Sequence, residues 1–437
     1  MNTIMNIAAI STPHGLGGIA VVRVSGPDAI ALVSKHFKPF NPKHILSDRP
    51  SHTLTFGQFL NASGEVLDEV VCSLYRGPHS FTGEDVIEIS CHGSVYIQQQ
   101  ILETLMGDDG LRLAEPGEFT RRAFAHGRLD LSQAEAVADL IASQNAAQHR
   151  IAMSQMKGSI SRQLDKLRDK LLKLTSLLEL ELDFSEEDVL FADRSELLDL
   201  AHSIDAEVLR LSGSFAAGNA IKNGIPVAIV GAPNVGKSTL LNALLKDDRA
   251  IVSDIQGTTR DLIEDTITLG GFLFRFIDTA GIRHTDDKVE QLGIERSKSA
   301  AQRAQIILLM SEPGVDFPSI EARPDQTVIP IQNKTSDFQA LNGIGVPQLE
   351  QQLISIARRT QGGDGDILIT NIRHKEALDQ AHRDIQLVVR GLEERLSGDL
   401  VAEDLHAVIE SLNTILGRSI TSQDTLNNIF SHFCVGK

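Results

Sequence analysis

The sequence predicts a multidomain fold: an α+β amino-terminal domain at residues 1–122, a discontinuous helical domain at 123–217 and 363–437, and an α/β domain at 218–362 inserted between the two helical parts. Three observations lead to this prediction. A chain of 437 residues is too long for one hydrophobic core. Short β-branched runs dominate its first part. Amphipathic helical patterns lie on both sides of an apolar run that leads into a glycine-rich loop.

The amino-terminal part alternates short apolar runs with Gly and Pro turns, as in IAVVRVSGP, SHTLTFGQF, EVVCSLYRGP and DVIEISCHG. Runs of this length indicate strands, and the stretch SVYIQQQILETLM that follows them has a helical pattern. Together they predict an α+β domain.

The helical part begins with Ser132 and Glu135, which fit a capping box at the start of a long helix. Farther on, leucines recur at alternating spacings of three and four, which indicates the buried seam of packed helices; they are Leu164, Leu167, Leu171, Leu174 and Leu178. Helical character ends near Phe215, and it returns after the linker-like TQGGDGD. We therefore predict that the α/β domain at 218–362 is inserted into one helical domain, because insertion is tolerated where the termini of the inserted domain lie close together.

Composition favours a soluble globular protein, with 42% hydrophobic and 23% charged residues. No apolar run approaches the ~18 to 20 residues that span a bilayer, and no basic segment leads into a signal-peptide core, so we expect a cytoplasmic location. Cys72, Cys91 and Cys434 are too widely spaced for a disulfide framework or a Cys-x-x-Cys metal site. The net charge of −17 requires any nucleic acid to meet a local basic patch or arrive with a helper protein.

The chemistry-bearing motif lies in IPVAIVGAPNVGKST, where residues 231–238 fit Gly-x4-Gly-Lys-Ser. A strand at 227–230 and a helix at 239–245 are predicted around it. Glycines let backbone N–H groups wrap phosphates, Lys237 neutralises their charge, and the Ser238 hydroxyl ligates Mg²⁺. The predicted nucleotide contacts in this loop are Asn234, Val235, Gly236, Lys237, Ser238 and Thr239.

Two further elements follow in the order expected of a nucleotide hydrolase. In DIQGTTRD, Thr258 or Thr259 offers a second hydroxyl to Mg²⁺, and in FRFIDTAG, Asp278 reaches Mg²⁺ through water. The Gly281 N–H senses the γ-phosphate, with Thr279 and Ala280 beside it. These motifs predict an NTPase without specifying the base.

The residue after DTAG is Ile282, which cannot orient water as the Gln of Ras-like enzymes does. Hydrolysis must then use polar groups from elsewhere, and the nearest are Asp286, Asp287 and Glu290. The one Arg in DIQGTTRD, Arg260, fits a solvated loop residue as well as an arginine finger.

The segment QNKTSDFQALNGIG is close to the guanine-selecting motif Asn-Lys-x-Asp but departs from it. Asn333 and Lys334 fit, whereas Ser336 stands at the carboxylate position and Asp337 comes one residue later. A hydroxyl only partly replaces the charge-assisted bonds that a carboxylate accepts from guanine N1 and N2. We expect guanine preference through a one-residue loop shift that brings Asp337 to the base, with the Ala340 N–H at O6. ATP hydrolysis is the alternative.

Five strings are spread along the whole chain: ISTPHGLGGIAVVRVSGP, SFTGEDVIEISCHG, EPGEFTRRAFAHGRLDLSQAEAVADLI, DTAGIRHTDDKVEQLGIERS and the terminal FCVGK. In these strings the chain resembles the bacterial and organellar tRNA-modification GTPases of the MnmE (TrmE) family. The resemblance implies a folate-binding, dimerising domain at the amino terminus and a P-loop GTPase domain at 218–362. The five residues between Lys334 and Ala340 are few for this family, so either the loop is trimmed or residues are absent from this sequence.

The resemblance also implies ligands. The family's folate contacts match Arg23, Glu88, Arg128 and Lys437, where Arg128 replaces the commoner Lys; the cofactor would be 5,10-methylenetetrahydrofolate, with 5-formyltetrahydrofolate as an analogue. From the residues alone, an Arg and a Glu near strand ends would form a surface salt bridge. A potassium ion would act in place of an arginine finger, and its matching ligands are Asn234, Ser253 (usually Thr), Ile255 and Thr258. Glu290 would orient water, although residue chemistry alone favours a solvated helix charge. Mg²⁺ would bind Ser238 and Thr259.

The function implied is addition of an aminomethyl or carboxymethylaminomethyl group to C5 of the wobble uridine (U34) of tRNA. An FAD-containing partner, MnmG, would supply redox chemistry, and GTP hydrolysis would drive pairing of the GTPase domains in a homodimer. Together with Lys237 and Glu290, Cys434 is a candidate catalytic residue, although a lone Cys is usually a core residue. Arg121, Arg122, Arg358 and Arg359 are candidates for tRNA contact. The alternative is a regulatory GTPase in ribosome assembly that performs no modification chemistry.

Overall fold

The computed structural model describes residues 5–183, 194–246, 265–277, 299–360, 367–419, 423–431 and 433–436. The chain divides into two compact units. The first combines Met1–Ala138, Gln155–Arg162 and Asn413–Lys437, and the second combines Asp139–Ser154 and Gln163–Leu412. The predicted boundaries at 122, 217 and 362 stay predictions. Among the described residues, no helix has the length and apolar character that crossing a membrane requires.

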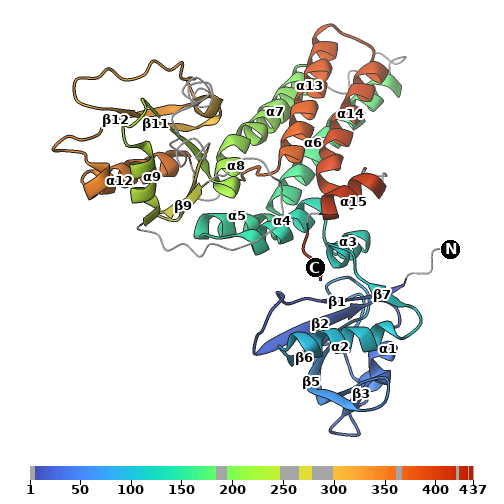
Figure 1. The fold of residues 1–437 in the computed structure, drawn as a ribbon. Helices are drawn as coiled ribbons and strands as arrows, with labels where there is room; N and C mark the ends of the chain where they lie inside the picture. The colour runs from blue at the N-terminus through green and yellow to red at the C-terminus, as the bar shows by residue number, and fades with distance from the viewer. Residues whose placement is uncertain are drawn as a thin grey trace. The chain divides into compact units, whose positions relative to one another are not determined.

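The first unit contains a seven-stranded sheet with the order β3-β4-β5-β6-β2-β1-β7 (Figure 1). Neighbouring strands are antiparallel except for β1 and β7, which are parallel. The strands are β1 (Asn6–Ile10), β2 (Ile19–Ser25), β3 (Phe37–Pro39), β4 (Thr53–Leu60), β5 (Val66–Tyr75), β6 (Val86–His92) and β7 (Leu111–Leu113).

Alternation along the central strands decides which side chains are buried. In β2, Val22 and Val24 are buried in a core to which α1 (Ala29–Lys35) and α2 (Val95–Met106) also contribute. Arg23 lies between these two valines and therefore points to the opposite face of the sheet. The strand register pairs Arg23 with Glu88 of β6. Two opposite charges thus lie side by side on the face away from this core.

Three further helices are α3 (Glu118–Ala125), α4 (Leu131–Ala142) and α15 (Gln423–Ser431). Helices α3 and α15 and the first residues of α4 belong to the first unit. The predicted capping box at Ser132 and Glu135 is wrong, because α4 starts before Ser132, at Leu131. Asp130 Oδ1 accepts from the Gln133 N–H at 2.9 Å, and Gln133 Oε1 accepts from the Asp130 N–H at 3.0 Å. This reciprocal pair caps the helix, while Ser132 lies inside it.

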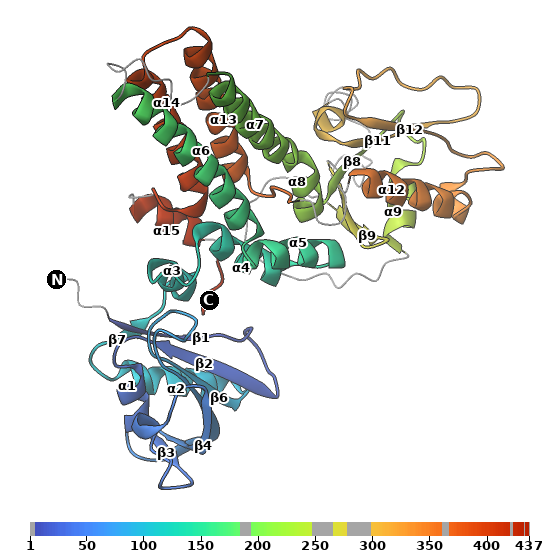
Figure 2. The same ribbon diagram turned by 180° about the vertical axis from the view of Figure 1, so that it is seen from behind.

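The second unit contains most residues of a group of helices: α5 (Ala146–Met156), α6 (Ser159–Asp183), α7 (Arg194–Gly213), α8 (Phe215–Asn223), α13 (Ile372–Glu393) and α14 (Gly398–Leu416). The last residues of α5 and α14 and the first residues of α6 belong to the first unit. The predicted leucine seam on α6 is confirmed, since all five leucines are buried. Helices α7 and α13 lie side by side (Figures 1 and 2), although the residues that form a five-stranded sheet come between them in the sequence. Asp205 of α7 accepts from His382 and Gln386 of α13.

That sheet has five strands in the order β12-β11-β8-β10-β9. They are β8 (Ile225–Gly231), β9 (Asp265–Leu269), β10 (Phe272–Phe276), β11 (Ile306–Ser311) and β12 (Thr327–Gln332), all parallel except for β9. Gly270 and Gly271, at φ +58° and +86°, form the tight turn between β9 and β10. Helices α9 (Lys237–Lys246) and α12 (Val346–Thr360) contribute to the core on one face.

Strand β8 has later strands on both sides, β10 and β11, so the chain leaves it at a topological switch point. Ligands of open α/β sheets bind where the carboxyl ends of the strands meet such a point. The glycine-rich loop between β8 and α9 occupies that place. The predicted strand and helix around this loop are confirmed.

Candidate functional site

The loop after β8 depends on two glycines. A Cβ atom at Gly231 would lie 2.7 Å from the carbonyl oxygen of Met310 in β11, closer than real Cβ contacts. Gly236 has a φ of +99°, and a Cβ there would lie 2.4 Å from Nδ2 of Asn333. The sequence therefore permits a tight loop whose amides open toward the start of α9, the arrangement that binds phosphates at a helix N-terminus.

Lys237 folds back over this loop. Its Nζ donates to the carbonyl oxygens of Gly231 at 2.8 Å and of Ala232 at 2.9 Å. Burial lowers the pKa of Lys237. Phosphate oxygens carry full negative charge and would be stronger acceptors than these two carbonyls. The predicted residues Ser238 and Thr239 follow in the first turn of α9, half-exposed.

Asn333 connects the phosphate loop to the predicted base-binding segment. Its side chain is buried, and Nδ2 donates to the Val235 carbonyl at 2.8 Å while Oδ1 accepts from the Ala340 N–H at 3.0 Å. Lys334 reaches back with Nζ 3.5 Å from the Asn234 carbonyl and 2.5 Å from Glu312. The structure thus brings together predicted residues that are about 100 positions apart in sequence.

Asp337 lies in a turn that carries it away from this arrangement. The N–H of Thr335 donates to the Phe338 carbonyl at 3.1 Å, and the Phe338 N–H donates to Thr335 Oγ1 at 3.0 Å. At the tip, the Ser336 hydroxyl lies 3.1 Å from Asp337 Oδ1, and both residues are exposed. The expected one-residue shift is not seen in this structure.

Several predicted site residues lie outside the described residues, so the predictions about Mg²⁺, K⁺ and the water-orienting carboxylate stay predictions there. They are Ser253, Ile255, Thr258, Thr259, Asp278, Thr279, Ala280, Gly281, Glu290 and Lys437.

The first unit brings Arg23, Glu88 and the carboxyl-terminal tail, residues 433–436, into one site. Arg23 donates through Nε at 2.9 Å and Nη2 at 2.7 Å to one oxygen of Glu88, Oε1. The guanidinium carbon of Arg23 lies 5.6 Å from the ring centroids of both Phe81 and Phe119. Within the described part of the chain, Oε2 of Glu88 has no hydrogen-bond donor.

The tail is fixed by main-chain contacts. The carbonyl of Gly436 accepts from Arg23 Nη1 at 3.3 Å and from the Ser11 hydroxyl at 3.0 Å, and the Gly117 N–H donates to the Cys434 carbonyl at 3.3 Å. A Cβ at Gly117 would lie 2.7 Å from the Phe430 carbonyl oxygen, so only glycine permits this approach. Sequence reasoning missed Ser11 and Gly117, although both lie in the strings that carry the family resemblance.

The remaining predicted residues of this unit differ in their surroundings. Cys434 is exposed, whereas Cys72 and Cys91 are buried, and burial together with the charge of Asp68 raises the pKa of Cys91 to about 11. Arg128 is exposed, and its guanidinium forms no ion pair with the residues that the structure describes.

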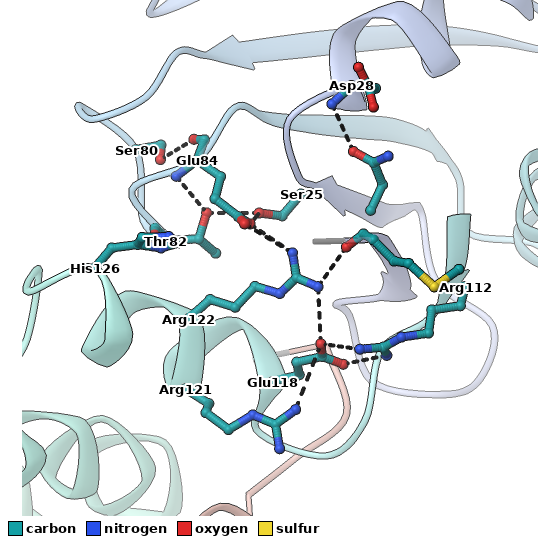
Figure 3. A network of polar contacts seen from close by, with 12 residues as sticks. Ser25, Asp28, Ser80, Thr82, Glu84, Arg112, Glu118, Arg121, Arg122 and His126 are labelled. Carbon is teal, nitrogen blue, oxygen red and sulfur yellow. Dashed lines mark hydrogen bonds and ion pairs between the residues drawn. The ribbon is translucent and has the colours of Figure 1, made fainter. Parts of the chain in front are cut away.

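A buried charge network supports the start of α3 (Figure 3). Glu118 accepts two hydrogen bonds from Arg112, at 2.7 and 2.6 Å, and one from Arg122 at 3.1 Å. Arg122 also bonds Glu84 at 2.9 Å. Burial opposes ionisation of Glu118, but the hydrogen bonds of Arg112 and of the Glu115 N–H outweigh burial and lower its pKa.

This network corrects one expectation about tRNA. Arg122 is largely buried and neutralised by Glu84 and Glu118, and Arg121 bonds Glu115 and Asn427. These two cations hold the fold together instead of forming a free basic patch. Arg358 and Arg359, in the last turn of α12, are exposed.

The glycine loop at the switch point and the Asn333 bridge behind it define a P-loop nucleotide-binding protein of the GTPase class. Comparison with known proteins is more specific: the MnmE helical domain matches residues 131–434, and the GTP-binding protein TrmE N-terminus matches residues 6–128. The chain belongs to the MnmE family of tRNA modification GTPases.

Relatives named tRNA modification GTPase MnmE match this chain along almost its full length. The Parabacteroides distasonis protein is 50% identical over 460 aligned positions, covering 99% of each chain. Proteins of Bacteroides fragilis (strain YCH46) and Porphyromonas gingivalis are 47% and 48% identical, covering 99% of this chain and 99% and 98% of their own. An alignment of 460 positions exceeds the 437 residues of this chain, so the first relative contains stretches that this chain lacks.

Replacing Lys237 by Ala removes the only lysine in the phosphate loop. Loss of a charge-assisted hydrogen bond, worth about 1.5–3 kcal/mol, predicts about ten- to a hundredfold weaker GDP binding in calorimetric titration. Lys173→Ala, an exposed lysine on α6, is the matched control and should bind as the wild type does. Equal affinity in Lys237→Ala would contradict the assignment of this loop.

Replacing Glu118 by Gln should destabilise the protein by about 1.5–3 kcal/mol at pH 7, because hydrogen bonds from Arg112 and Arg122 lose their charged acceptor. Since the pKa of Glu118 is lowered on folding, its contribution is complete above the ordinary value of about 4.5 and is lost as the pH falls through the lowered one. The difference from the wild type in urea unfolding should therefore shrink in acid. Glu115→Gln, at an exposed pair with Arg121, should cost about 0–1 kcal/mol.

Proposed function

We propose that this chain is a potassium-dependent GTPase that works with the flavoprotein MnmG to add an aminomethyl or carboxymethylaminomethyl group to C5 of the wobble uridine (U34) of tRNA. Family membership over nearly the whole chain supports this proposal. The observation that carries it is the site formed by Arg23, Glu88 and the tail, which a GTPase without modification chemistry would not require.

The residues of this site fit a reduced folate. A pterin ring presents adjacent N–H donors, and a carboxylate oxygen such as Glu88 Oε2 is a strong acceptor for them. The rings of Phe81 and Phe119 beside Arg23 offer apolar contact for the flat ring system. 5,10-Methylenetetrahydrofolate would supply the one-carbon unit, with Arg128 and Lys437 as further contacts. Cys434, exposed on the tail that Gly117 and Arg23 hold, is the proposed reactive thiol.

GTP would bind at the loop of the second unit. The amides of residues 234–239 would surround the phosphates, Lys237 would neutralise their charge, and the Ser238 hydroxyl would ligate Mg²⁺. We assign the further Mg²⁺ and K⁺ contacts to Thr259, Asn234, Ser253, Ile255 and Thr258, and the water-positioning role to Glu290. Hydrolysis removes the γ-phosphate that holds the switch loops, and its departure would then control the pairing of GTPase domains inserted into the helical domain.

Dimerisation through the amino-terminal unit is supported by an apolar surface on its sheet. Leu54 and Phe56 of β4 are 64% and 52% exposed, and Phe40, 49% exposed, packs against Phe56 with ring centroids 4.8 Å apart. Clustered exposed apolar side chains mark interaction surfaces. Because the chain carries a net charge of −17, the proposed MnmG partner would provide much of the positive surface that tRNA requires.

Glu88→Gln should weaken binding of 5-formyltetrahydrofolate to the full chain about ten- to a hundredfold, since a charged acceptor is lost. In cells lacking the protein, this variant should fail to restore the wobble modification, measured by nucleoside analysis of tRNA. Glu69→Gln, an exposed carboxylate on β5, is the matched control and should restore it. Normal nucleosides in the absence of the protein would instead favour the assembly role.

Replacement of potassium by sodium should lower GTP turnover at least about tenfold, because the larger ion is assigned the role of an arginine finger, worth ~10³ to 10⁵ in rate. Asn234→Ala should turn over GTP equally slowly in both salts. Turnover of the wild type that is the same in sodium and potassium would refute the cation mechanism.

A further inference from the structure

The base-reading loop, residues 333–340, carries a feature that goes beyond the proposed GTPase function and rests on it. Guanine-selecting sites place a carboxylate three residues after the Asn, whereas this chain places Ser336 there. Whether Asp337 can replace that carboxylate depends on whether the loop can shift by one residue. The contacts on both sides of Ser336 bear directly on this question.

The amino side of the loop is fixed by Asn333. Both ends of its buried amide are bonded, to the Val235 carbonyl and to the Ala340 N–H. A one-residue shift of the loop would displace Asn333 and break its hydrogen bond to the Val235 carbonyl of the phosphate loop. The position of Thr335, two residues on, is fixed in turn by its hydrogen bonds with Phe338.

The carboxyl side is fixed by Phe338. Its ring packs against the core of the five-stranded sheet, and a Cβ at Gly345 would lie 2.5 Å from ring atom Cδ2. Gln339, the next residue, exchanges two backbone hydrogen bonds with Ile344, at 2.9 and 3.2 Å. A one-residue shift would pull the phenyl ring out of this contact and break both bonds.

Only Ser336 and Asp337 remain between the fixed residues. Asp337 lies at the exposed tip, with its carboxylate bonded to the Ser336 hydroxyl. The register therefore keeps Ser336, and not Asp337, at the position that faces the base edge in a guanine-selecting site. A hydroxyl is uncharged and offers one oxygen where a carboxylate offers two, so its hydrogen bonds to the N1 and 2-amino donors are weaker.

The remaining polar groups of the loop read features that guanine shares with hypoxanthine. The Asn333 amide has a second hydrogen for the purine N7. The Ala340 N–H, which donates to Asn333 Oδ1 in this structure, would be shared with a 6-oxo group of the base and would oppose the amino group of adenine. The 2-amino group is the one difference between guanine and hypoxanthine, and a carboxylate is what normally reads it.

We propose that the base site of this chain recognises 6-oxopurine nucleotides without reading the 2-amino group, so that guanine and hypoxanthine nucleotides bind alike, and that Ser336 sets this specificity. Adenine nucleotides bind less well than either. The substrate class of the site is thus broader than GTP and includes ITP.

The test is calorimetric titration of the full chain with GDP, IDP and ADP. The expected result is a GDP-to-IDP affinity ratio below about five, with ADP weakest. Ser336→Asp should raise that ratio above about ten by restoring a charged acceptor. Asp337→Asn should leave the ratio where it is, as should Asp316→Asn, an exposed carboxylate elsewhere in the second unit.

A wild-type ratio above about ten would overturn the proposal, and its collapse in Asp337→Asn would show that the loop shifts on binding. Failure of Ser336→Asp to change the ratio would equally overturn the role of Ser336. If none of the three nucleotides binds, the proposed GTPase function itself is refuted. If GDP binds much more tightly than IDP, only the proposal about base specificity is refuted.

Discussion

The side-chain amide of Asn333 is the interaction on which the nucleotide site depends. It bonds one backbone group of the phosphate loop and one of the base-reading loop, and it is buried where water cannot replace either bond. Two segments about 100 residues apart are thereby joined by one buried side chain. The close approach of Gly236 to Asn333 Nδ2 explains why the loop needs glycine beside the lysine.

Local chemistry is enough to predict much of the fold. The apolar run of β8 and the leucines of α6 have periodicities that only one secondary structure satisfies, so the strand, the helix and the buried seam agree with the structure. The start of α4 does not. DLSQ and SQAE both fit a capping box, and the sequence alone does not decide between Asp130 and Ser132.

The sites are predictable to a smaller extent, because long-range contacts decide what a charged residue does. Family resemblance points to Arg23 and Glu88, and strand register explains their pairing. The sequence alone suggests that Arg121 and Arg122 are surface cations, whereas the structure shows that they form ion pairs with Glu84, Glu115 and Glu118. Ser11 and Gly117 could not be predicted from the sequence, because their partners are backbone carbonyls more than 300 residues away.

The hydrogen bond from Arg23 to the Gly436 carbonyl spans 413 residues of sequence. During synthesis on the ribosome, the amino-terminal sheet emerges and pairs its strands long before residue 436 has been made. Arg23 and Ser11 must wait for that segment, so the proposed folate site is assembled late in translation. A nascent chain that stops short of the tail would carry a folded sheet with an unfinished site, which ties cofactor capture to synthesis of the tail.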